Sequence, residues 1–149
     1  EDLIMKILVC TDGSEQSQKA LEKSALIAGG CNVDEVAVLH VYEDTPLPIQ
    51  AYTDEVVDRY MQVKEDIKKE KEEILNDALK FYKEKGIKAR TILKEGHPAE
   101  TIVEVGCGEG FDFIVIGSRG LGGLKKAFLG SISNAVVQQA EKCSVIVVR

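Results

Sequence analysis

The amino-acid sequence predicts an α/β fold in which a five-stranded parallel sheet carries helices on both faces. Five short runs of apolar, mostly β-branched residues alternate along the chain with four longer segments of helical character. Such alternation is typical of a parallel sheet, because each return to the same sheet needs a crossover segment. With 149 residues, the chain has room for one such domain, which we expect to span residues 1–149.

The first half of the chain predicts two strands and two helices. Residues 5–11 form a short apolar run that ends at Asp12-Gly13-Ser14, a cluster of turn and N-cap residues. We expect a helix over residues 14–28, ended by Gly29-Gly30, and a Val-rich strand over residues 35–42. A long helix over residues 53–85 follows, and the charged stretch 64–73 is interpreted as its solvated face.

The second half predicts three further strands and two helices. Residues 88–94 resemble a strand with one exposed side, which places it near a sheet edge. Pro98 marks the first turn of the next helix, and the preceding His97 is interpreted as structural or capping. Three glycines that precede a strand are interpreted as the stop of this helix; they are Gly106, Gly108 and Gly110. Strands over residues 111–117 and 144–149 flank the last helix.

The glycine-rich stretch 117–133 lies between a predicted strand and a predicted helix, an arrangement suited to binding anions. Glycines let backbone N–H groups approach a phosphate, and the start of a helix favours negative charge. The spacing excludes a P-loop, because no glycine is followed by Lys-Ser or Lys-Thr. It also excludes the dinucleotide fingerprint, because Lys125 stands where the third glycine would be needed.

Gly117-x-x-Gly120, nine residues and then Gly130-Ser131 form a pattern similar to the ATP-binding signature of the universal stress protein family. The resemblance covers nearly the whole chain and implies the strand order 3-2-1-4-5, ATP as ligand and a homodimer formed through residues 144–149. It implies that the adenine and ribose meet Thr11, Asp12 and Val41. It also implies a set of phosphate-binding residues, namely Gly117, Arg119, Gly120, Gly130, Ser131, Ile132 and Ser133. The chain departs from the family at two positions. Cys10 stands where proline or alanine is common, and Ser144 stands where proline is common.

Composition excludes several function classes. A net charge of −6 argues against a nucleic-acid surface, and no apolar run approaches the length of a membrane span. With no signal-peptide pattern, we expect a cytoplasmic protein. Its four cysteines show no zinc-binding spacing and are expected to be free, mostly buried thiols; they are Cys10, Cys31, Cys107 and Cys143. Because no carboxylate cluster is evident, Mg²⁺ is expected to be held by the phosphates and water.

Three functions stay open on this basis. The first is an ATP-binding regulatory module whose nucleotide state is read by a partner or by its own dimer. The second is a slow ATPase or a phosphoryl- or nucleotidyl-transferase, for which Asp12 is the acid that can be placed in the crevice. The third is a dimeric scaffold that acts without nucleotide. A two-component receiver is set aside, because the predicted third strand ends in Lys94-Glu95 and not in the aspartate that such a domain phosphorylates.

Overall fold

The structure is a computed structural model that describes residues 4–47, 53–119 and 129–149. Strands and helices alternate along these residues as predicted: β1 Met5–Cys10, α1 Glu15–Gly30, β2 Val33–Tyr42, α2 Asp54–Glu84, β3 Ala89–Glu95, α3 Pro98–Gly108, β4 Phe113–Gly117, α4 Ser131–Gln139 and β5 Ser144–Val148. The five strands form one parallel sheet in the order β3-β2-β1-β4-β5. The predicted fold class and strand order are confirmed.

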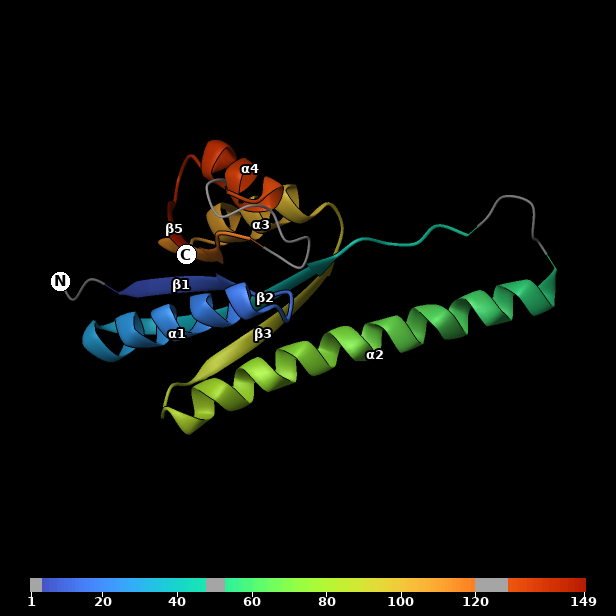
Figure 1. Cartoon of the computed structure of the whole chain (residues 1–149), viewed down its shortest axis with the longest axis horizontal. Helices are drawn as coiled ribbons and strands as arrows, with labels where there is room; N and C mark the ends of the chain where they lie inside the picture. Colours follow the sequence, from blue (N-terminus) through green and yellow to red (C-terminus); the bar gives the residue numbers. More distant parts are fainter. Residues whose placement is uncertain (1–3, 48–52, 120–128) are drawn as a thin grey trace.

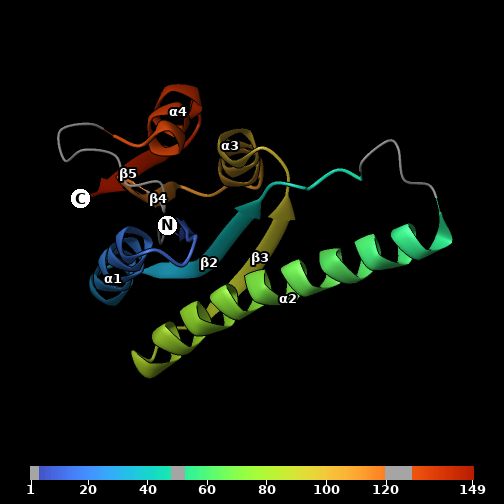
Figure 2. The same ribbon diagram turned by 45° about the vertical axis from the view of Figure 1, so that its right-hand side comes forward.

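Two layers of helices enclose the sheet. Helices α1 and α2 lie on one face, and α3 and α4 lie on the other (Figures 1 and 2). Residues of β1 alternate between the two layers: Ile7 and Val9 pack with α1 and α2, whereas Leu8 packs with α3 and α4. All three side chains are fully buried, which explains why this strand has no polar alternation in its sequence.

Most of the glycines that were predicted to end helices lie inside them. Both Gly29 and Gly30 belong to α1, which is capped by Cys31 instead. Gly106 and Gly108 likewise lie within α3, and Gly110 follows it with φ +78°. A Cβ at Gly106 would lie 2.5 Å from Ile114 Cδ1, so this glycine is there to let α3 pack closely on β4 and not to end the helix.

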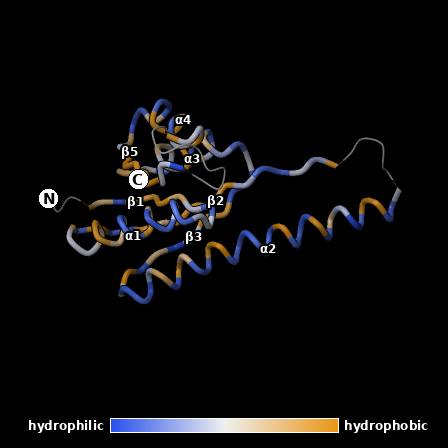
Figure 3. The backbone as a smooth tube through the Cα atoms, viewed as in Figure 1, coloured by the Kyte–Doolittle hydropathy of each residue, from blue (hydrophilic) through white to orange (hydrophobic). Residues whose placement is uncertain are grey.

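Helix α2 is longer than the sheet that it covers. Its second half packs on β2 and β3, while its first half projects beyond the sheet (Figures 1 and 2). Apolar positions recur among polar ones along its whole length (Figure 3), and Met61 is 59% exposed. Lys64 forms ion pairs with Asp44 at 3.0 Å and Glu95 at 3.5 Å. Most of the stretch 64–73 is exposed, as predicted.

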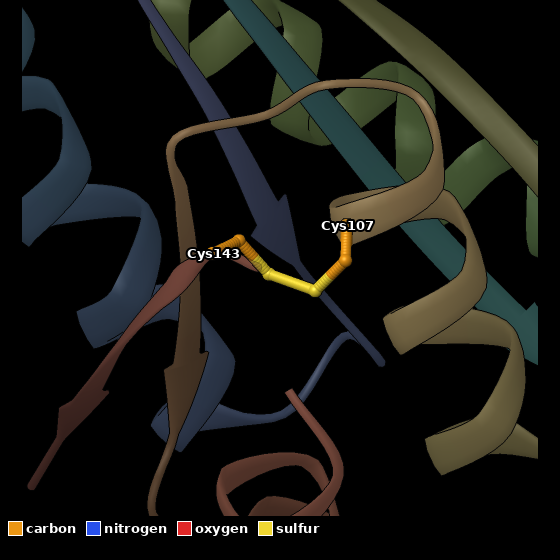
Figure 4. The surroundings of a disulfide bond; sticks show 2 residues. All are labelled: Cys107 and Cys143. Atoms are coloured by element: carbon orange, nitrogen blue, oxygen red, sulfur yellow. A yellow bond between two sulfur atoms is a disulfide. The ribbon is translucent and has the colours of Figure 1, made fainter. Parts of the chain in front are cut away.

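The cysteines correct the expectation of four free thiols. Cys107 near the end of α3 and Cys143 before β5 form a disulfide, with their Cα atoms 5.3 Å apart (Figure 4). Cys10 is buried and Cys31 is exposed, and both are free. The two cysteines are 36 residues apart in the sequence, so no local motif indicates that they pair. Helix α3 packs against α4 on the face of β4, and β4 pairs with β5, so this packing brings the two cysteines together.

Candidate functional site

The candidate site lies at the carboxyl edge of the sheet, where β1 and β4 end side by side. Val9 of β1 pairs with Val115 of β4, and the two strands end shortly after this pair, at Cys10 and Gly117. After β1 the chain passes to α1 on one face, and after β4 it passes to α4 on the other face. Ligands of open α/β sheets bind at such a switch point, because the connections leave a crevice between them.

The turn between β1 and α1 is held by its own side chains. The Ser14 N–H donates to Asp12 Oδ1 at 2.9 Å, and the Gly13 N–H donates to Thr11 Oγ1 at 3.2 Å. The Ser17 hydroxyl donates to the Ser14 carbonyl at 2.9 Å, so the Thr11 hydroxyl donates to Ser17 Oγ at 3.1 Å. Gly13 has φ +81°, a conformation that glycine adopts without strain. This network fixes the half-buried Asp12 directly after the end of β1.

Gly117 allows α1 to lie directly on the end of β4. A Cβ at this position would lie 2.8 Å from the Gln16 carbonyl oxygen, closer than any ordinary contact. Because the neighbour is backbone, no side-chain movement would relieve the overlap. The family resemblance implies a phosphate-binding role for Gly117, and the structure shows a separate role in helix packing.

The start of α4 is tied to the residues that follow β4. The Gly130 N–H donates to the Ser118 carbonyl at 2.6 Å. The buried Ser133 hydroxyl lies 3.0 Å from both the Ser118 and the Gly130 carbonyl oxygens. The N-cap of α4 is Gly130, which has no side chain to cap the helix, and the first helical bond is donated by the Asn134 N–H. The three preceding N–H groups therefore have no acceptor within the helix, which creates a positive end.

Val41 presents open backbone groups at the same edge of the sheet, near the end of β2. The Gly96 N–H of the β3 side donates to the Tyr42 carbonyl, so the backbone groups of Tyr42 point toward β3. Backbone groups alternate in direction along a strand, and those of Val41 therefore point toward the end of β1. The backbone hydrogen bonds between described residues include none from Val41 to Thr11 or Gly13, the residues past the end of β1.

The structure thus brings most of the sequence-predicted site residues to one edge. These are Thr11, Asp12, Val41, Gly117, Arg119, Gly130, Ser131, Ile132 and Ser133. Gly120 lies outside the described residues, as does the rest of the segment 120–128 between β4 and α4. Sequence reasoning missed His40, whose Nδ1 lies 2.7 Å from the Thr11 carbonyl oxygen. Its place in an apolar strand gave no sign of this contact. His97 is the N-cap of α3 but makes no capping bond through its side chain.

The described residues contain no group of three or more acidic, His or Cys side chains that could hold a metal ion. A divalent ion at this site would therefore need ligands from a bound phosphate and from water. Among the same residues, no helix is long and apolar enough to cross a membrane.

Comparison with known proteins places this geometry in a family. A model of the universal stress protein family matches residues 4–149. The chain belongs to that family. Universal stress protein YxiE of Bacillus subtilis is 36% identical over 147 residues, which cover 97% of this chain and 98% of YxiE.

Solved structures of universal stress proteins share the fold. The structure of MJ0577, from Methanocaldococcus jannaschii, has a TM-score of 0.80 at 30% identity and covers 97% of this chain and 94% of that chain. A universal stress protein from Archaeoglobus fulgidus in complex with dAMP has a TM-score of 0.64 at 23% identity, covering 97% and 98%. The second likeness concerns the fold alone.

Proposed function

We propose that this universal stress protein binds ATP at the carboxyl edge of the sheet and acts as a cytoplasmic regulatory module that responds to nucleotide. The observation that carries the proposal is the pair of open backbone surfaces at this edge of the sheet. Val41 supplies a donor and an acceptor on the β2 side, and the first turn of α4 supplies N–H donors beyond β4. A nucleotide has complementary groups at its two ends.

The Val41 backbone suits an adenine base. The Watson–Crick edge of adenine offers one ring nitrogen acceptor and one amino donor next to each other. A strand residue with an open N–H and an open carbonyl can satisfy both. In this arrangement, the Asp12 carboxylate, which accepts from the Ser14 N–H at Oδ1, lies on the ribose side of the base.

The start of α4 suits the phosphates. The N–H groups of Ser131, Ile132 and Ser133 lie in the first helical turn, where the helix dipole favours anions. Ser131 is exposed, so its hydroxyl is available to a phosphate oxygen, whereas the hydroxyl of Ser133 is engaged with the backbone. Arg119 and Gly120 complete the proposed phosphate-binding set, with Gly117 and Gly130 keeping the backbone close.

The fold is known to accommodate such a ligand. The Archaeoglobus fulgidus protein of the same fold was solved with dAMP, an adenine nucleotide. A regulatory role fits the geometry better than catalysis does. Efficient phosphoryl transfer needs a group that positions the nucleophile, and the Asp12 carboxylate is already engaged in holding the turn.

Calorimetric titration of the protein with ATP tests the proposal. We expect one site per chain, with Mg²⁺ required for full affinity because the phosphates and water are its ligands. GTP, whose base edge presents a carbonyl where adenine has its amino group, should bind more weakly. Equal ATP affinity with and without EDTA would contradict the metal requirement, and no heat with any adenine nucleotide would contradict the proposal itself.

The edge strand β5 supports a homodimer of this protein. β5 pairs with β4 on one side, and among the described residues no strand pairs with its other edge. An apolar strand with one unpaired edge promotes self-association, and pairing with the same strand of a second copy would remove that edge. Light scattering at micromolar concentration should show a dimer, and Ile146→Pro should give monomers or aggregates. A monomeric wild-type protein would contradict this assembly.

A further inference from the structure

The pairing of β1 with β2 stops one hydrogen bond earlier than the sheet geometry would allow. The Thr11 N–H donates to the Leu39 carbonyl at 2.9 Å, as expected for parallel strands. In a parallel ladder the next bond would run from the Val41 N–H to the Thr11 carbonyl. The backbone bonds of the described residues do not include it.

The side chain of His40 takes the place of this missing bond. Its Nδ1 lies 2.7 Å from the Thr11 carbonyl oxygen, and the residue is 5% exposed. A carbonyl can only accept, so Nδ1 carries the hydrogen and Nε2 carries a lone pair. Within the structure Nε2 is buried without a hydrogen-bond partner. The ring therefore holds the Thr11 carbonyl by a single, directed contact.

The groups around His40 favour the neutral ring. Burial lowers the pKa of His40, and the positive charge of Lys71 on α2 adds to this effect. The hydrogen bond to Thr11 and the negative charge of Asp12 act in the opposite direction but do not outweigh burial. On its own strand, the Tyr42 ring lies 6.5 Å away, centroid to centroid. At neutral pH the ring is thus an uncharged donor through Nδ1.

We propose that His40 is a positioning residue for adenine recognition, which keeps the Val41 backbone open by engaging the Thr11 carbonyl. This inference rests on the proposed ATP site. The ring and Val41 lie on adjacent residues of β2, so the side chain of one residue controls the backbone partner of the next. Without the imidazole, the Thr11 carbonyl would accept from the Val41 N–H, and the strands would pair across the place where the base binds.

Amide hydrogen exchange of the nucleotide-free protein, measured by NMR, tests this step directly. The wild-type Val41 amide should exchange readily, and His40→Leu should slow it about tenfold or more by creating a strand hydrogen bond. His40→Asn places an amide donor near the Nδ1 position and should restore wild-type exchange. His97→Leu, which changes the other histidine on an exposed helix start, is the matched control and should change nothing.

ATP affinity provides the second readout. His40→Leu should lose about ten- to a hundredfold in affinity, the equivalent of one or two hydrogen bonds, and much of its preference for ATP over GTP. His40→Asn should recover both. If the wild type binds no adenine nucleotide, the proposed function fails, but the exchange experiment still judges the role of His40. A protected Val41 amide in the wild type, or an unchanged one in a folded His40→Leu, would overturn the inference.

Discussion

Replacing Gly130 with valine is expected to weaken ATP binding by about two to four decades. The loss corresponds to two charge-assisted hydrogen bonds of roughly 1.5–3 kcal/mol each between phosphate oxygens and the start of α4. A Cβ at Gly130 would lie 3.2 Å from the Ser118 carbonyl oxygen and 3.3 Å from the Arg119 Cα. Both neighbours are backbone, so the added side chain shifts the segment that we propose holds the phosphates. Calorimetry with ATP and Mg²⁺ measures the effect.

The stability of the same variant distinguishes a role of Gly130 in phosphate binding from a role in packing alone. Gly130 is buried, so we expect a lower melting temperature as well as lost affinity. Gly29→Val is the matched control, because a Cβ there meets nothing within 4 Å and Gly29 lies far along α1 from the site. It should keep full ATP affinity. A Gly130→Val protein that melts early but binds ATP normally would assign this glycine to packing alone.

Removing the Cys107–Cys143 disulfide is expected to lower the free energy of unfolding by about 4 kcal/mol. In the chain-entropy model, the cost follows from the loop that the bond closes, here a sequence separation of 36 residues. That loop contains β4, the glycine-rich connection and α4, which together form one side of the candidate site. Denaturant unfolding of the double variant Cys107→Ser/Cys143→Ser, compared with the oxidised wild type, measures the change.

Thiol counting checks that the bond is present. Two thiols should react in unfolded, unreduced protein, and four after reduction. In the folded protein Cys31 should react first, because burial raises the pKa of the Cys10 thiol to about 12. Cys31→Ser is the control variant and should leave stability nearly unchanged. Four reactive thiols before reduction would contradict the disulfide.

Acidification should destabilise the protein through His40. Its pKa is lowered in the folded state, so the unfolded chain binds more protons between the folded pKa and the ordinary value of about 6.5. The contribution of His40 to the free energy of unfolding is complete above its ordinary pKa and is lost as the pH falls through the lower pKa of the folded state. Denaturant unfolding at several pH values should show a slope over this range that is smaller in His40→Asn. An identical slope in both proteins would contradict the assignment.

The sequence predicted the sheet because its determinants are local. Buried parallel strands leave continuous apolar runs such as residues 5–11, and the helices between them show their own periodicity. Contacts between distant segments leave no such trace. The overlap that Gly117 avoids depends on the path of α1 over β4, and Gly106 depends on the side chain of Ile114 in the same way.

The candidate site was predicted unevenly for the same reason. The glycine-rich stretch and Asp12 carry recognisable residue types in a fixed order, so the sequence located them. The proposed role of Val41 could be predicted only from family resemblance, because unpaired backbone N–H and carbonyl groups leave no signal in the sequence. His40 and the Cys107–Cys143 pair depend on partners 29 and 36 residues away in the chain. Those pairings become visible only when the strands are placed side by side.

The most direct test of the ATP site is a chemical-shift map of the backbone amides on addition of ATP and Mg²⁺. The proposed geometry predicts the largest shifts in two segments separated in sequence: Asp12 and Val41 at the base end, and Ser131 and Ile132 at the phosphate end. Adenosine alone should move the first pair and spare the second. Saturable shifts confined to other parts of the sheet, such as the amino ends of β1 and β5, would contradict the site.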